Sequence, residues 1–215
     1  MEFDIDSILR DYFAKEDRER HVGVYYPSEL GFCIRRNWYL YKYPRPVDDA
    51  TKKVVAVGKI FHEFIFKALE SKKFNVHENE KSLSIIDGEN GLVISGRIDH
   101  LIKVDNDSEP FIIEVKTSKS VKSLKEAKRE HKMQIMPYMI ALQVKKAMII
   151  YVEKDNLDTK SFEFEFDDEL FKDMMQRARR LHNCLTTNVF PPAEAKEDMS
   201  VGWMCLYCQY RDMCR

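Results

Sequence analysis

The sequence has little glycine and proline, and it lacks a long apolar run. Seven Gly and seven Pro among 215 residues, with 44% hydrophobic residues, exclude collagen-like and broadly disordered chains and predict a packed core. No apolar stretch approaches the roughly 18–20 residues that a membrane span needs. The opening, MEFDIDSILRDYF, is acidic where a signal peptide would be basic and then apolar. We therefore expect one globular domain in the cytoplasm, with no membrane partner.

An excess of positive charge is also missing, because 35 Lys and Arg face 36 Asp and Glu. Any nucleic-acid binding must therefore rest on local patches. Residues 116–132 hold six Lys and one Arg against two Glu, whereas residues 153–169 hold eight acidic residues against two Lys. Arg177, Arg179 and Arg180 form a further candidate patch. A solvated helix face has the same composition, so these patches alone do not establish DNA binding.

The hydrophobic periodicity alternates between helix and strand along the chain. It predicts helices over about 5–13, 50–69, 123–144 and 168–185, and another after Pro27 with Ser28 as N-cap. It predicts strands over about 75–86, 92–104 and 111–117, then a buried strand AMIIYVE and an edge strand SFEFEFD. This order favours an α/β fold with a mixed sheet flanked by helices.

Glu114 and Lys116 are two residues apart, so on a strand they share one face. With a turn near Asp107, Asp99 on the preceding strand lies roughly opposite Lys116 and on the same face. Carboxylate oxygens are the ligands that Mg²⁺ and Mn²⁺ prefer, and a lysine beside them can assist an attacking water at a phosphate. A salt bridge on a solvated sheet face would give the same Glu-x-Lys pattern.

Two helical pairs add to this pattern. Gly58 and His62 are four residues apart, so the glycine would let its helix approach the sheet while His62 reaches the same metal. Gln134 and Tyr138 place an amide and a phenol on one helical face. Either pair alone is typical of ordinary helix packing.

In the order G-x3-H, GxxD, E-x-K and Q-x3-Y, residues 58–138 resemble the RecB-like branch of the PD-(D/E)xK nuclease superfamily. The resemblance implies a restriction-endonuclease-like core with a central mixed β-sheet flanked by helices. Ile98 precedes Asp99 where the superfamily pattern has proline, which this branch often lacks. The implied metal ligands are His62, Asp99, Glu114 and the backbone carbonyl of Val115. The implied catalytic residues are Asp99, Glu114, Lys116, Gln134 and Tyr138, the last two positioning DNA or supporting the site.

The five cysteines are an odd number, which argues against a disulfide framework. The tail carries Cys205, Cys208 and Cys214 as C-x2-C-x5-C, which can bring thiolates to one metal ion or cluster, and Cys33 is the natural fourth ligand. RecB-like nucleases with an iron–sulfur cluster use one cysteine before the core and three after it, so the resemblance implies such a cluster, with [4Fe–4S] favoured over [2Fe–2S]. A zinc site with the same four cysteines stays open. Cys184 fits neither arrangement and is expected to be buried.

A stand-alone domain of this length with these cysteines is similar to the CRISPR-associated exonuclease (cas-four) family. That similarity implies a Mg²⁺- or Mn²⁺-dependent deoxyribonuclease that acts on single-stranded DNA ends and processes fragments for spacer acquisition with the CRISPR integrase complex. It divides the chain into a helical segment (1–49), a nuclease core (50–185) and a cysteine-rich segment (186–215). The cluster would join the first and the last of these segments. Candidate DNA-binding cations are Arg35, Arg36, Lys119 and Lys122, and candidate base-stacking aromatics are Trp38, Tyr39 and Tyr138.

Two other functions fit the same residues. A DNA repair or replication nuclease shares this core, because the motifs define the chemistry and not the pathway. A non-catalytic subunit that binds DNA ends is the alternative outside the enzymes. The oligomeric state is open, with a homo-oligomer among the options.

Overall fold

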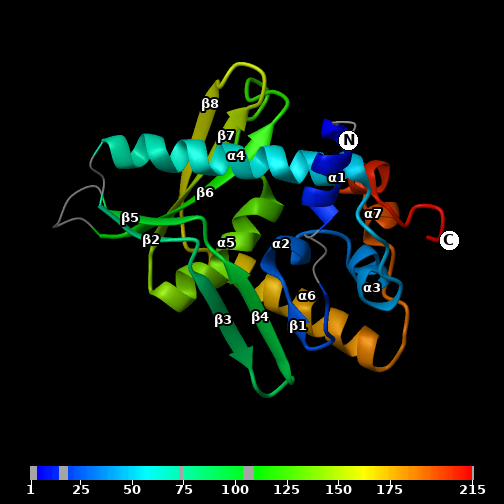
Figure 1. Cartoon of the computed structure of the whole chain (residues 1–215). Helices are drawn as coiled ribbons and strands as arrows, with labels where there is room; N and C mark the ends of the chain where they lie inside the picture. The colour runs from blue at the N-terminus through cyan, green and yellow to red at the C-terminus, as the bar shows by residue number, and fades with distance from the viewer. Residues whose placement is uncertain (1–3, 15–18, 73–74, 104–108, 215) are drawn as a thin grey trace.

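The computed structural model describes residues 4–14, 19–72, 75–103 and 109–214 (Figure 1). The first part of the chain forms α1 (Ile5–Ala14), β1 (Val24–Tyr25), α2 (Pro27–Leu30), α3 (Ile34–Lys42) and α4 (Asp49–Ser71). The strands β2 (Asn75–Asn79), β3 (Ser82–Asp87), β4 (Leu92–Arg97), β5 (His100–Lys103) and β6 (Phe111–Ser118) follow. The last part forms α5 (Arg129–Leu142), β7 (Lys146–Glu153), β8 (Thr159–Glu165), α6 (Asp168–Thr186), α7 (Glu194–Glu197) and the 3₁₀ helix η1 (Gly202–Tyr207).

The strands form two sheets where the sequence predicted one. A five-stranded sheet has the order β2-β5-β6-β7-β8, in which only β6 and β7 pair in parallel. A three-stranded sheet has the order β1-β4-β3. The mixed α/β class is confirmed, and SFEFEFD is the edge strand β8, as its alternation predicts.

The second sheet exists because two of the predicted strands are each broken. The chain turns between β2 and β3 at Glu80, whose φ of 53° lies in the left-handed region, and it bends between β4 and β5 at Asp99. A positive φ redirects an extended chain. The turn predicted near Asp107 lies outside the described residues.

Helices cover both faces of the five-stranded sheet. Ile113 and Val115 of β6 pack in one apolar cluster with Phe61 and Ile65 of α4. Ile112, on the other face of the strand, belongs to the main core together with α5 and α6 residues. Figure 1 shows α4 lying across the strands. The alternation of β6 therefore turns Glu114 and Lys116 toward α5.

Three helix predictions differ from the structure. The helix after Pro27 is two helices, α2 and α3, and Tyr26 rather than Ser28 is the N-cap because proline occupies the first helical turn. The helix predicted from 123 begins at Arg129. A Cβ atom at Gly58 would meet nothing within 4 Å, so the expected close approach of α4 to the sheet at this glycine is wrong.

The segment that contains α3 packs against the C-terminal segment. Tyr39 of α3 stacks on Tyr210 with ring centroids 5.3 Å apart, and its hydroxyl donates to the Met213 carbonyl at 3.1 Å. Arg45 donates to both carboxylate oxygens of Asp212 at 3.0 and 2.9 Å. In Figure 1, α3, α7 and the C-terminus lie on the same side of the molecule. Over the described ranges, no helix is long and apolar enough to cross a membrane.

Candidate active site

Three predicted residues form a closed triangle of hydrogen bonds between β6 and α5. Glu114 is only 1% exposed, and its Oε1 accepts from Lys116 Nζ and from Gln134 Nε2, both at 2.6 Å. Lys116 Nζ also donates to Gln134 Oε1 at 2.9 Å. The strand period places Glu114 and Lys116 on one face, and α5 packs on that face, so the amide of Gln134 reaches both.

Asp99 lies where the chain leaves the three-stranded sheet for the five-stranded one. The last residue pair of β5 and β6 is His100 with Ile113, so the next position places Asp99 opposite Glu114 rather than opposite Lys116. The register predicted from the turn was wrong by two residues, which keeps the side chains on the same face. Because β5 begins only at His100, the Val115 N–H donates to the Asp99 side chain, at 2.8 Å to Oδ2, instead of to a strand.

His62 approaches this carboxylate from α4. Its Nδ1 lies 3.3 Å from Asp99 Oδ2. The N–H and C=O of one residue in an extended strand point to the same edge, so the Val115 carbonyl faces the edge that Asp99 occupies. The structure therefore brings His62, Asp99, Glu114 and Val115 into one neighbourhood.

Burial and charge act against each other in this cluster. Burial, followed by the negative charge of Asp99, raises the pKa of Glu114 to about 7, although Lys116 opposes the shift. Burial would also raise the pKa of Asp99, but the hydrogen bond and charge of His62 outweigh it and lower that pKa. For His62, burial lowers the pKa, and the contact with Asp99 outweighs burial and raises it. The two carboxylates repel each other, so a cation between them would be stabilised.

The donor set fits a divalent cation that prefers oxygen ligands. Glu114 Oε2 is buried and accepts no hydrogen bond from the described residues, and an unsatisfied buried carboxylate oxygen is costly. No three His, Cys, Asp or Glu side chains in the described ranges form a ready-made metal cage. Mg²⁺ needs none, because it is commonly held by one or two carboxylates together with waters and substrate phosphates.

Tyr138 lies one helical turn after Gln134 and is 3% exposed. A Cβ atom at Gly96 would lie 2.2 Å from the Tyr138 hydroxyl, so this glycine lets the ring pack under β4, the strand that leads to Asp99. Trp38 and Tyr39 are likewise only 2% and 4% exposed. The prediction that these three aromatics stack on DNA bases is wrong, because they fill the core.

The predicted DNA-binding cations lie in separate places. Lys119 and Lys122 are exposed just after β6. Arg35 and Arg36 lie in the first turn of α3, where Arg35 Nε donates to the Pro191 carbonyl at 2.7 Å and the Arg36 guanidinium lies over the Phe32 ring. In α6, Arg177 and Arg179 form ion pairs with Glu194 and Asp87, respectively.

Four of the five cysteines line one cavity of about 460 Å³ between α3 and the C-terminal segment: Cys33, Cys205, Cys208 and Cys214. All five are free thiols. Burial raises the pKa of Cys208, and the neighbouring Cys33 and Cys214 add to the shift. The fifth, Cys184, is buried in the main core, as expected for a small apolar side chain.

The motifs did not indicate three polar residues that the structure places near these sites. His100 follows Asp99, is 2% exposed and stacks on Phe66, and neither of its ring nitrogens has a hydrogen-bond partner in the described part of the chain. His131 contacts Tyr151. Glu194 pairs with Arg177 beside Cys33. Each depends on a contact between distant segments, for which the local sequence contains no signal.

The PD-(D/E)XK nuclease superfamily pattern matches residues 45–215. The CRISPR-associated exonuclease Cas4 of Saccharolobus solfataricus is 25% identical over 217 residues, which cover 96% of this chain and 98% of that protein. The crystal structure of SSO0001 has a TM-score of 0.63 and 23% identity, and the match covers 99% of this chain and 96% of that one. The exonuclease LHK-Exo of Laribacter hongkongensis, in complex with dAMP, has a TM-score of 0.55 and 14% identity, with 84% and 94% covered.

The two solved structures support the fold alone, whereas the superfamily match spans most of the chain, including β6 with Glu114 and Lys116. The chain is thus a homologue of the Cas4 exonuclease, and it belongs to the PD-(D/E)XK nuclease superfamily.

Proposed function

We propose that this protein is a deoxyribonuclease that uses Mg²⁺ or Mn²⁺ to cleave nucleotides from single-stranded DNA ends. One observation carries the proposal: Glu114 is buried beside Asp99 with one carboxylate oxygen bound by Lys116 and Gln134 and the other without a partner among the described residues. This arrangement suits a cation site next to a lysine. A salt bridge on a solvated sheet face would leave Glu114 exposed, and it is not.

The ligands in this proposal are His62, Asp99, Glu114 and the Val115 carbonyl. A bound divalent cation would supply Lewis-acid polarisation of the phosphate and a more acidic water. Lys116 orients the attacking water and stabilises charge on the phosphate, because its ammonium is held in place by Glu114 and Gln134. Gln134 thus positions both residues. Tyr138 has an indirect role, because its ring packs against Gly96 and so supports β4 and the bend at Asp99.

Lys119 and Lys122 are proposed to bind the phosphate backbone, since both are exposed immediately after the strand that carries Lys116. Arg36 is better placed to serve the cysteine cavity, which it lines. The action on DNA ends is supported by the Cas4 relative, which is named an exonuclease. The single-strand preference rests on the resemblance of the motifs to the CRISPR-associated family.

We also propose that the four cysteines around the cavity hold an iron–sulfur cluster, [4Fe–4S] rather than [2Fe–2S]. The four thiols surround one cavity of about 460 Å³, and the preference for a cluster over one zinc rests on the resemblance of the cysteine spacing to RecB-like nucleases that carry a cluster. Arg36, Lys196 and Arg211 line the same cavity and would offset the negative charge of the thiolates. The cluster would join segments 1–49 and 186–215 across the core at 50–185.

The biological setting follows from the Cas4 relative, whose name is CRISPR-associated exonuclease. We propose that the protein processes DNA fragments for spacer acquisition in the cytoplasm, with the CRISPR integrase complex as partner. A homo-oligomer is compatible with this role.

The nuclease proposal is tested with labelled single-stranded and duplex oligonucleotides, incubated with Mg²⁺, Mn²⁺ or a chelator. Wild type should shorten single strands from an end only when metal is present. Lys116→Ala should lose about 10²–10³-fold in rate. Lys146→Ala removes a lysine that pairs with Glu163 on the exposed part of β7 and β8, and should cleave normally. Cleavage that is unchanged in Lys116→Ala, or independent of metal, would refute the proposal, and DNA binding without cleavage would indicate an end-binding subunit.

The cluster proposal is tested by visible spectroscopy and metal analysis of anaerobically purified protein. A brown preparation with about four iron atoms per chain is expected for [4Fe–4S]. A colourless preparation with one zinc per chain would contradict it.

A further inference from the structure

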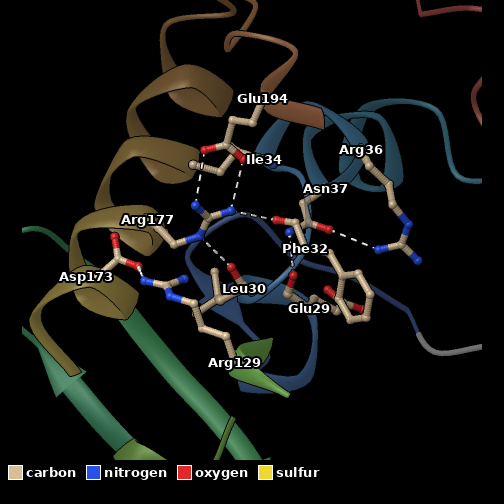
Figure 2. Close-up of polar contacts among 10 residues, drawn as sticks. All are labelled: Glu29, Leu30, Phe32, Ile34, Arg36, Asn37, Arg129, Asp173, Arg177 and Glu194. Atoms are coloured by element: carbon tan, nitrogen blue, oxygen red, sulfur yellow. Dashed lines mark hydrogen bonds and ion pairs between the residues drawn. The ribbon is translucent and has the colours of Figure 1, made fainter. Parts of the chain in front are cut away.

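Arg177 of α6 and Glu194 of α7 form a two-point ion pair (Figure 2). Ala193 and Ala195, the neighbours of Glu194 in the chain, line the cysteine cavity. Arg177 Nη1 donates to Glu194 Oε1 at 3.1 Å, and Nη2 donates to Oε2 at 2.9 Å. The two side chains are 17% and 21% exposed. A two-point pair is stronger than a single contact and has a defined orientation, because the planar guanidinium forms two hydrogen bonds with the carboxylate.

The pair also binds the backbone on both sides of Cys33. Arg177 Nη2 donates to the Phe32 carbonyl at 2.8 Å, and Nε donates to the Leu30 carbonyl at 2.7 Å. On the other side, the Ile34 N–H donates to Glu194 Oε2 at 2.9 Å. The residues that precede and follow Cys33 are therefore fixed by one charged pair from other elements, as Figure 2 shows.

The position of Cys33 explains why external contacts are needed. Cys33 is the N-cap residue of α3, and its side chain makes no capping hydrogen bond. The first N–H groups of a helix need acceptors, which a Ser, Thr, Asp or Asn N-cap would supply. A cysteine whose thiol is reserved for a metal cannot do so. Glu194 of α7 supplies an acceptor for the first of these groups, the Ile34 N–H.

The pair lies behind the wall of the cavity, which Glu194 reaches through its two neighbours in the chain. Ala193 and Ala195, on either side of Glu194, line it together with Cys33. The Cys205 thiol lies 3.5 Å from the Ala195 carbonyl. The pair thus connects α6 of the nuclease core, the turn that carries Cys33 and the segment that leads to the other three cysteines.

We infer that Arg177 and Glu194 are positioning residues that hold the Cys33 thiol at the cavity and so retain the cluster. This inference rests on the proposed cluster. An ordinary ion pair between α6 and α7 would have no reason to bind the Leu30, Phe32 and Ile34 backbone as well. Residues that orient metal ligands in this way typically change metal affinity about 10–100-fold when mutated.

The test compares anaerobically purified full-length variants by iron content, visible absorbance and the rate of iron release to a ferrous chelator. Arg177→Met should release iron about 10–100-fold faster than wild type. Arg177→Lys keeps the charge but not the fork that binds a carboxylate and two carbonyls, so it should also release iron faster. Arg179→Met is the matched control, because Arg179 lies on the same helix and pairs with Asp87 instead. It should release iron at the wild-type rate.

Circular dichroism shows whether each variant is folded, so that cluster loss is separated from unfolding. If Arg177→Met does not fold, Glu194→Gln, which keeps the volume and an acceptor oxygen, should still accelerate release. Wild-type iron content and release rate in folded Arg177→Met or Glu194→Gln would overturn the inference, as would equal acceleration in Arg179→Met. A wild-type protein without iron would instead refute the proposed cluster itself.

Discussion

His131 lies in the first turn of α5, three residues before Gln134. Its Nδ1 is 2.9 Å from the Tyr151 hydroxyl. Burial, followed by the positive charges of Lys116 and Lys128, lowers its pKa from 6.5 to about 3. The folded protein therefore keeps this imidazole neutral in a range where the unfolded chain protonates it.

This pKa shift predicts a stability loss in mild acid. The unfolded state binds more protons than the folded state between pH 6.5 and 3, so the free energy of unfolding is at its full value above 6.5 and falls as the pH falls. At pH 5, protonation of His131 in the unfolded state should have lowered the free energy of unfolding by about 1–2 kcal/mol relative to pH 7. Denaturant unfolding at pH 7 and pH 5 measures it.

His131→Asn is the control variant, because it removes the titration and keeps a polar group near the Tyr151 hydroxyl. The difference between wild type and variant isolates His131 from Glu114, whose raised pKa acts in the opposite direction. Equal loss of stability in both proteins between pH 7 and pH 5 would contradict the prediction.

The sequence predicted which residues share one face of the sheet at the proposed site, but not how their side chains are held. The two-residue spacing of Glu114 and Lys116 determines their common face, and that prediction is confirmed. The hydrogen bonds of Gln134 to both residues depend on how α5 packs on β6. So does the Glu114 oxygen that has no hydrogen-bond partner among the described residues. That packing is a tertiary feature with no local signal.

At the scale of elements, β4 and α5 meet at one glycine. The Tyr138 ring occupies the space where a Gly96 side chain would be, with the ring carbon that bears the hydroxyl 3.0 Å from an added Cβ. Tyr138 is buried, so the ring cannot move into solvent without opening the core. The bend at Asp99 follows three residues later.

Gly96→Ala should therefore displace Tyr138 or β4. Overpacking of this kind typically costs about 1–3 kcal/mol, and the shift of Asp99 should lower metal-dependent cleavage about tenfold or more. Thermal unfolding and the oligonucleotide assay measure the two effects. The double variant Gly96→Ala with Tyr138→Leu, which removes the clash, should recover stability relative to Gly96→Ala, and failure to do so would contradict this packing account.

Gly58→Ala is expected to have the opposite effect on stability. Gly58 lies inside α4, and an added Cβ would meet nothing within 4 Å. Alanine is favoured over glycine in a helix by about 0.5–1 kcal/mol, so the free energy of unfolding should rise by that amount. A loss of stability would show that α4 is packed more closely at this position than the structure indicates.

Most helices and strands were predictable, and their breaks were not. The edge strand β8 and the helix α6 follow from period and length. The breaks at Glu80 and Asp99 leave the apolar pattern of the flanking strands intact. The pattern therefore predicts two long strands, over about 75–86 and 92–104, instead of four shorter ones. The division into two sheets depends on the left-handed φ of Glu80 and on the bend at Asp99, which the pattern does not encode.

At the scale of the whole molecule, a cluster would join two segments, the one around α3 and the C-terminal one, that are already in contact. Closing a loop of about 170 residues has a substantial entropic effect on the unfolded chain, while the Tyr39–Tyr210 and Arg45–Asp212 contacts hold the same ends without metal. Removal of the cluster should therefore loosen the ends without unfolding the core. Hydrogen exchange should become faster in α3 and η1 and stay unchanged in β6 and β7, and uniform acceleration would contradict this picture.

The central claim is that Glu114 and Asp99 form a divalent-cation site next to Lys116. Titration of the protein with Mn²⁺, followed by electron paramagnetic resonance, tests it without relying on cleavage. We predict that the protein binds one Mn²⁺, which Mg²⁺ displaces. Glu114→Gln should weaken the Mn²⁺ affinity at least about tenfold, and Lys146→Gln should leave it unchanged. Wild-type Mn²⁺ affinity in folded Glu114→Gln would contradict the account.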